Sequence, residues 1–284
     1  MMTKNTCIFF KNPVVRVLTA IFIIASVPTQ SGAQLTPGYQ VSIKFPPVAD
    51  RGAPERTSPG GRRGGCDLKE ATPSHINSRI ELTAIAPINN IITTVVPNPA
   101  VYVHIATIID QQVNFRVLEK GTKIEVYNTN FQLPHTAGIV KVKLPETVKL
   151  QANKIYNWEF LVICDPEDSS DDKLVKGLLE RKSLTFEQLD KIEQIKENPI
   201  EQAKLYAEYG VWHETLEILD LLRKNSQFKA EWNELLSSVK LQSLANYPVI
   251  NCCQVANSRA APATINNIKK PQPDSLPNTG WGGN

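Results

Sequence analysis

The sequence has little of what metal centres and disulfide frameworks need, with 5 cysteines and 4 histidines among 284 residues. It contains no C-x-x-C motif, and its histidines show no ligand spacing, so a structural zinc site is not indicated. A G-x-G-x-x-G or Walker loop, a G-x-S-x-G elbow and an H-E-x-x-H motif are also missing. We therefore expect no cofactor and no enzymatic activity. A Ser, His and Asp set assembled from distant positions stays open, because sequence order does not define it.

The sequence also lacks an excess of charge once its first segment is set aside. The formal net charge is +3, and Lys4, Lys11 and Arg16 lie in residues 1–33, which contain no acid. Without these three, the 31 Lys and Arg residues fall to the same number as the 28 Asp and Glu residues. Nucleic-acid binding needs clustered basic residues in excess, so it is disfavoured.

Long hydrophobic runs are the third absence. The apolar run 17–27 is too short to span a bilayer comfortably, and no later stretch approaches the 18 or so apolar residues of a membrane helix. The run follows basic residues and precedes Ser31-Gly32-Ala33, which predicts a secretory signal peptide over 1–33; an uncleaved anchor is the alternative. We expect a periplasmic or extracellular protein that contacts the membrane only through this peptide before cleavage.

Export would place the remaining cysteines in an oxidising compartment. Cys66 opens the first ordered region and Cys164 closes a strong strand pattern, so we predict a Cys66–Cys164 disulfide. Cys252 and Cys253 are adjacent, and a strained vicinal bridge, intermolecular pairing and free thiols all stay open.

Residues 34–65 are expected to be a linker, because the Gly-, Pro- and Arg-rich stretch 50–65 cannot bury enough apolar surface to offset its ordering entropy. Residues 66–182 read as a β domain. Its candidate strands alternate apolar and polar residues between turn signals, and they cover 80–86, 101–105, 114–118, 124–127, 138–144, 156–162 and 174–180. Short connections between strands favour an antiparallel β-sandwich over a nucleotide-binding fold.

Residues 183–247 have the helical period. Thr185-x-x-Gln188 is a capping box, Asn198-Pro199 starts a second helix, and two further apolar stripes follow Gly210. Residues 248–284 are rich in Pro, Asn and Gly and are expected to be a disordered tail. The predicted class is α+β: an antiparallel β-sandwich followed by a small C-terminal helical bundle.

Two resemblances extend this interpretation. The stretch 203–216 resembles the middle of a tetratricopeptide unit, in which small and aromatic residues flank a glycine turn. That resemblance implies protein binding, and it makes Tyr206, Tyr209 and Trp212 candidate partner-binding residues.

On a larger scale the chain resembles the cyanobacterial domain-of-unknown-function family 928. Three motifs carry the resemblance: the Gly/Arg-rich lead into Cys66, the aromatic strand 158–166 ending in Cys-Asp-Pro, and the Tyr206-Ala…Gly-x-Trp212 turn. The family pattern has Arg-Ser soon after Cys-Asp-Pro, whereas this chain has Ser169-Ser170. The resemblance implies an exported envelope protein and no established activity.

The remaining candidate sites are an acidic loop and a set of strand aromatics. Five carboxylates in the loop are the kind of ligands that Ca²⁺ takes, although a solvated hairpin loop is the alternative: Asp165, Glu167, Asp168, Asp171 and Asp172. The aromatics could form a glycan-binding platform or part of the core: Tyr102, Tyr127, Tyr156, Trp158 and Phe160. His104 and His213 are expected at the surface.

The favoured function is a non-enzymatic, exported module that binds another envelope or secreted protein. A glycan- or small-ligand-binding sandwich is the second candidate, and an unrecognised hydrolase is the third.

Overall fold

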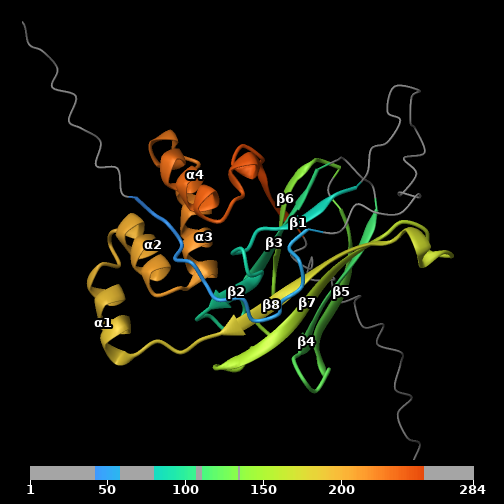
Figure 1. The fold of residues 1–284 in the computed structure, drawn as a ribbon, viewed down its shortest axis with the longest axis horizontal. Coiled ribbons are helices and arrows are strands. Elements are labelled where there is room, and N and C mark those ends of the chain that lie inside the picture. The colour runs from blue at the N-terminus through green and yellow to red at the C-terminus, as the bar shows by residue number, and fades with distance from the viewer. Residues whose placement is uncertain (1–41, 58–79, 107–110, 134, 253–284) are drawn as a thin grey trace, which may run out of the picture. The chain divides into compact units, whose positions relative to one another are not determined.

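The computed structural model describes residues 42–57, 80–106, 111–133 and 135–252, drawn in colour in Figure 1. The predicted signal peptide, Cys66 and Cys253 with the rest of the tail lie outside the described residues. Within the described part, no helix has the length and apolar character needed to cross a membrane.

Nine strands in the described residues form two sheets. The four-stranded sheet has the order β1 (Leu82–Ala84), β3 (Ala100–Ile105), β6 (Gly138–Lys143), β9 (Val249–Cys252). The five-stranded sheet has the order β2 (Ile91–Thr94), β8 (Lys173–Arg181), β7 (Lys154–Ile163), β4 (Gln112–Glu119), β5 (Glu125–Gln132). All seven predicted strands are present, and the predicted α+β class is confirmed.

Two strand pairs are parallel, which the antiparallel prediction did not include. β2 pairs with β8, placing Ile91 opposite Leu178, and β6 pairs with β9, placing Ile139 opposite Val249. Parallel pairing needs a long connection, and both pairs join strands far apart in the sequence. Turn signals reveal hairpin neighbours only. β2 is too short to show alternation, and β9 occupies a segment that we expected to be disordered.

Four α-helices and three short 3₁₀ turns complete the described part. The helices are α1 (Phe186–Gln194), α2 (Pro199–Glu208), α3 (Trp212–Leu222) and α4 (Lys229–Ser238). The turns are η1 (Ser169–Asp171), η2 (Ser226–Phe228) and η3 (Gln242–Leu244). The capping box is confirmed: Gln188 N–H donates to Thr185 Oγ1 at 3.2 Å, and Thr185 N–H donates to Gln188 Oε1 at 2.9 Å. Gly210 turns the chain between α2 and α3 with φ of 65°.

Residues 42–57 are an extended segment, here called the N-terminal strap, and they do not behave as the linker that we predicted. Ile43 and Phe45 are buried in the core that joins sheets and helices. The strap runs past α3 and α4 toward the strands (Figure 1, blue), and Phe45 N–H donates to Ser238 Oγ on α4 at 3.0 Å. At its far end, Ala84 N–H on β1 donates to Arg56 O at 2.8 Å. The composition of residues 50–65 indicates a linker, but two apolar residues before that stretch, Ile43 and Phe45, anchor the strap.

β3 is buried on both faces, which corrects the surface position predicted for His104. Its ring lies 4.2 Å from the Tyr247 ring, and only 4% of the residue is exposed. Strand alternation placed His104 opposite Val103 correctly, but the C-terminal segment covers that face as well.

Candidate functional site

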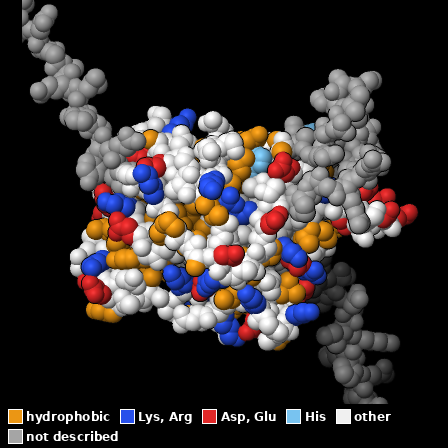
Figure 2. Space-filling model, in the orientation of Figure 1, with side chains coloured by type: hydrophobic (Ala, Val, Ile, Leu, Met, Phe, Trp, Pro, Cys, Tyr) orange, Lys and Arg blue, Asp and Glu red, His pale blue; other side chains and the backbone are white. Residues whose placement is uncertain are grey.

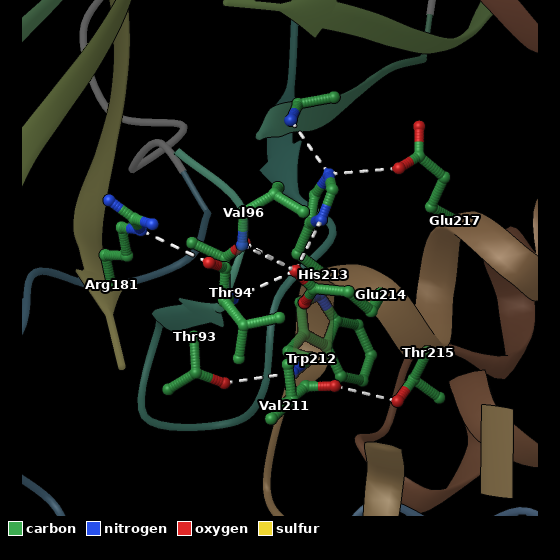
Figure 3. A network of polar contacts seen from close by, with 12 residues as sticks. Thr93, Thr94, Val96, Arg181, Val211, Trp212, His213, Glu214, Thr215 and Glu217 are labelled. Atoms are coloured by element: carbon green, nitrogen blue, oxygen red, sulfur yellow. Dashed lines mark hydrogen bonds and ion pairs between the residues drawn. The ribbon is translucent and has the colours of Figure 1, made fainter. Parts of the chain in front are cut away.

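The start of α3 is the point where the helical segment is fixed to the sheets. Trp212 has none of its surface exposed; its Nε1–H donates to Ile85 O at 3.0 Å, and its ring meets Phe45 edge-on at 5.1 Å. The helix has no side-chain cap of its own. Instead Thr93 on β2 supplies one: its Oγ1 accepts from Trp212 N–H at 2.9 Å (Figure 3) and donates to Gly210 O at 2.7 Å.

Glu214 closes the turn that follows β2. Its Oε1 accepts three hydrogen bonds, from Thr94 Oγ1 at 2.8 Å, Val95 N–H at 2.9 Å and Val96 N–H at 3.1 Å (Figure 3). Burial alone would raise the pKa of Glu214, but His213 and the donors on Oε1 favour the charged form and hold the pKa below its usual value. A buried carboxylate thus serves as an acceptor for backbone N–H groups of the turn that follows β2.

His213 is also buried in this junction, which makes the predicted surface position wrong. Its Nε2 accepts from Ala100 N–H at 2.9 Å. Nδ1 lies 3.6 Å from Glu214 Oε1, and Nε2 lies 3.6 Å from Glu217 Oε2. With its lone pair held by a backbone N–H, the ring is placed to dock α3 onto β3.

Charged groups continue the junction along α3. Lys141 on β6 contacts Glu217 Oε1 at 2.7 Å and lies 5.2 Å from the centre of the Tyr102 ring. Burial would raise the pKa of Glu217, but His213 and Lys141 hold it below its usual value. At Asp220 burial prevails and raises the pKa despite Arg223, whose Nε lies 3.2 Å from Asp220 Oδ1. Burial likewise raises the pKa of Tyr102 well above its usual value.

The candidate partner-binding residues differ in how far this junction buries them. Tyr206 and Tyr209 on the α2 side are partly exposed and accessible to a partner. Trp212 is not, so its assignment as a partner contact is corrected. The helical period predicted an apolar stripe, but α3 is covered by β2, the strap and α4 at once, and only tertiary packing shows that.

In the acidic loop, three of the five carboxylates accept hydrogen bonds from backbone N–H groups of the loop itself. Asp165 Oδ1 accepts from Glu167 N–H at 2.8 Å, and Asp168 Oδ1 caps η1 by accepting from Ser170 N–H at 2.9 Å. Asp172 Oδ1 accepts from Cys164 N–H at 2.9 Å. No group of three or more His, Cys, Asp or Glu residues in the described part could hold a metal ion. Calcium binding stays a prediction, as does the Cys66–Cys164 disulfide.

The proposed glycan platform is not present at the surface. Four of its five aromatics are almost completely buried: Tyr102, Tyr156, Trp158 and Phe160. The half-buried Tyr127 packs edge-on against Phe115 at 6.2 Å. These side chains form the core, which was the other interpretation of strand aromatics.

Helix α1 presents apolar side chains to solvent. Phe186 is 86% exposed and Leu189 is 51% exposed, while Ile192 on the same helix is buried. The same helix contributes to the α1–α2 groove, a cavity of about 310 Å³ that neither Phe186 nor Leu189 lines; its lining residues are Lys191, Gln194, Ile195, Glu201, Lys204, Leu205 and Glu208. Over α1 and α2, hydrophobic side chains lie among charged ones of both signs (Figure 2).

These features define an α+β protein in which a helical segment is fixed to two mixed sheets through a buried polar junction. The family described as Domain of Unknown Function (DUF928) matches residues 58–249. The chain belongs to this family. The family resemblance drawn from the sequence is thereby confirmed; the cyanobacterial origin and the tetratricopeptide likeness stay predictions.

Among solved structures, two similar chains are β-glucuronidases. β-Glucuronidase 3 of Bacteroides uniformis is 15% identical, with 61% of this chain and 27% of that chain covered and a TM-score of 0.24. The Parabacteroides merdae enzyme is 11% identical, with 60% and 28% covered and a TM-score of 0.25. The chain thus spans less than a third of either enzyme, and a likeness this slight carries no argument about fold or activity. No curated protein matches the chain.

Proposed function

We propose that the chain is an exported, non-enzymatic interaction module, and that its α1–α2 groove binds a basic, amphipathic helix of another envelope or secreted protein. The observation that carries the proposal is a groove between two helices that the apolar side chains of Ile195 and Leu205 line; α1 also exposes Phe186 and Leu189 outside the groove. Large apolar side chains clustered on one face are typical of interaction sites. A groove between helices accepts the apolar face of a partner helix.

Charge complementarity defines the partner's other face. Residues 186–208 contain six acids and three bases, and the groove itself is lined by two of each, Glu201 and Glu208 with Lys191 and Lys204. Two of the three bases are already paired, because Lys191 contacts Glu187 at 2.8 Å and Lys196 contacts Glu193 at 2.5 Å. The surplus negative charge favours a partner helix that is rich in Lys or Arg.

Export rests on the sequence alone, through the basic, apolar and small-residue parts of residues 1–33. The N-terminal residue of the protein recovered from its native host tests this part. We expect a chain that starts at Gln34. A chain that keeps Met1 and stays in the cytoplasm would contradict export without touching the groove.

Cross-linking mass spectrometry in intact cells tests the groove. We expect one stoichiometric partner, linked to Lys191, Lys196 or Lys204 through a basic amphipathic segment. Ile195→Ser combined with Leu205→Ser changes the two apolar side chains that line the groove and should abolish those links. The matched control is Ile124→Ser, which removes an apolar side chain, 59% exposed, between β4 and β5. Self-links alone, an acidic linked segment, or links that survive the double variant would each overturn the proposal.

The glycan-binding alternative loses its main support because the aromatics that suggested it are buried. No specific contact in the described residues favours it over a protein partner.

A further inference from the structure

A second cavity, of about 380 Å³, lies where the end of α3, the start of α4 and residues 245–248 meet. Three of its nine lining residues are cations, Arg223, Lys224 and Lys229, and none of the nine is Asp or Glu. Residues 184–245 as a whole contain eleven acids and seven bases. Three of the seven cations of an acidic segment are therefore gathered around one cavity.

Arg223 is held in a fixed position at the back of this cavity. Its Nη1 donates to Tyr247 O at 3.1 Å, its Nε donates to Asp220 Oδ1 at 3.2 Å, and its guanidinium lies 4.4 Å from the centre of the Trp232 ring. The Arg side chain is 15% exposed. Nη2 makes no hydrogen bond to the part of the chain that the structure describes, so two N–H donors of a rigid guanidinium remain available.

Lys224 and Lys229 are exposed and form no ion pair within the described residues. Lys229 is also the first residue of α4, where the helix dipole disfavours a positive charge. Its first turn has no side-chain cap. An anion seated between the two ammonium groups and Arg223 would offset these unfavourable charges.

We propose that this cavity binds a small organic molecule through a phosphate or sulfate group. A tetrahedral oxyanion group has enough oxygens to accept from the guanidinium and from two ammonium groups at once. The volume exceeds that of the ion alone, so the rest of the molecule would lie against Tyr247 and the side-chain amide of Asn233. This site is separate from the α1–α2 groove and independent of the function proposed there.

The test uses the full chain and two probes, inorganic phosphate and inorganic sulfate, titrated at constant ionic strength against sodium chloride. Calorimetry should show saturable binding of at least one oxyanion, and the tighter of the two identifies the ligand group. Lys224→Gln combined with Lys229→Gln should weaken that binding about tenfold or more. These side chains are exposed and Lys229 opposes the helix dipole, so the variant should melt no lower than the parent.

Lys120→Gln combined with Lys123→Gln is the control, because it removes the same charge from two exposed lysines between β4 and β5. It should change the affinity less than about twofold. Equal weakening in both double variants, or binding no tighter than that of chloride, would mean general charge screening and would overturn the site.

Discussion

Helices α1 and α3 are of similar length, with 9 and 11 residues, but they are stabilised in opposite ways. α1 has its own capping box and an internal Lys191–Glu187 pair, and it exposes its largest apolar residues. α3 has no side-chain cap of its own, takes Thr93 from β2 in that role, and buries seven of its residues. Local chemistry is therefore enough to start a helix, whereas tertiary contacts decide whether the helix becomes core or surface.

Removing one aromatic side chain from each helix should give the largest difference in the free energy of unfolding. Trp212→Ala leaves a cavity beside Phe45 and frees the Ile85 carbonyl, so we expect a loss of about 3–5 kcal/mol in the free energy of unfolding. Phe186→Ala, at an exposed position, should change it by less than about 0.5 kcal/mol. Urea unfolding measures both. A loss below about 1 kcal/mol for Trp212→Ala would mean that α3 is not fixed through this ring.

Glu214→Gln should have the next largest effect, about 2 kcal/mol at neutral pH, because charge-assisted hydrogen bonds to Thr94, Val95 and Val96 are weakened. The lowered pKa of Glu214 means that its stabilisation is present above the unfolded-state pKa and is lost as pH falls through the lower folded-state pKa. The gap between the parent and the variant should therefore shrink on acidification.

Urea unfolding at about pH 7 and about pH 3 measures that gap. Glu217, with a lowered pKa, acts in the same direction, whereas Asp220, with a raised pKa, contributes stability at low pH that is lost as pH rises through its folded-state value. Both remain in the variant, so the difference isolates Glu214. A gap that widens in acid would contradict the assignment.

The smallest global effect should come from Thr185→Ala in α1. Losing the cap costs about 1 kcal/mol, but α1 makes few contacts with the rest of the fold and can unfold locally. We expect faster amide exchange confined to residues 186–194 and nearly unchanged global unfolding. If the global free energy fell by the same amount, α1 would be an integral part of the cooperative unit.

Much of the fold was predictable because its signals are local. The alternation in β4 and β7 places one face inward, and the helix starts at Thr185 and Asn198 satisfy backbone donors within the same few residues. No local signal marks the three elements that the sequence did not predict, which are β2, β9 and the strap. Each is short and is held by partners that lie far away in the sequence.

The candidate sites were harder to predict than the fold. His213 and Glu214 resemble surface residues in the sequence, since polar side chains at a helix start are ordinary. A buried polar pair leaves no pattern of its own. The cationic cavity joins Arg223 and Lys229 to Tyr247, which lies beyond the end of α4.

The sequence by itself determined the α+β class, most strand positions, the helix starts and the family, because these depend on side-chain periodicity, on caps within one turn and on motifs in order. Only the tertiary structure decided that Trp212 is core and Phe186 is surface. It also paired β2 with β8 and packed residues 42–57, part of the segment predicted to be a linker, against the core as a strap. The reason is physical: burial and parallel pairing depend on which distant segment covers a side chain or a backbone edge, and no neighbouring residue encodes that.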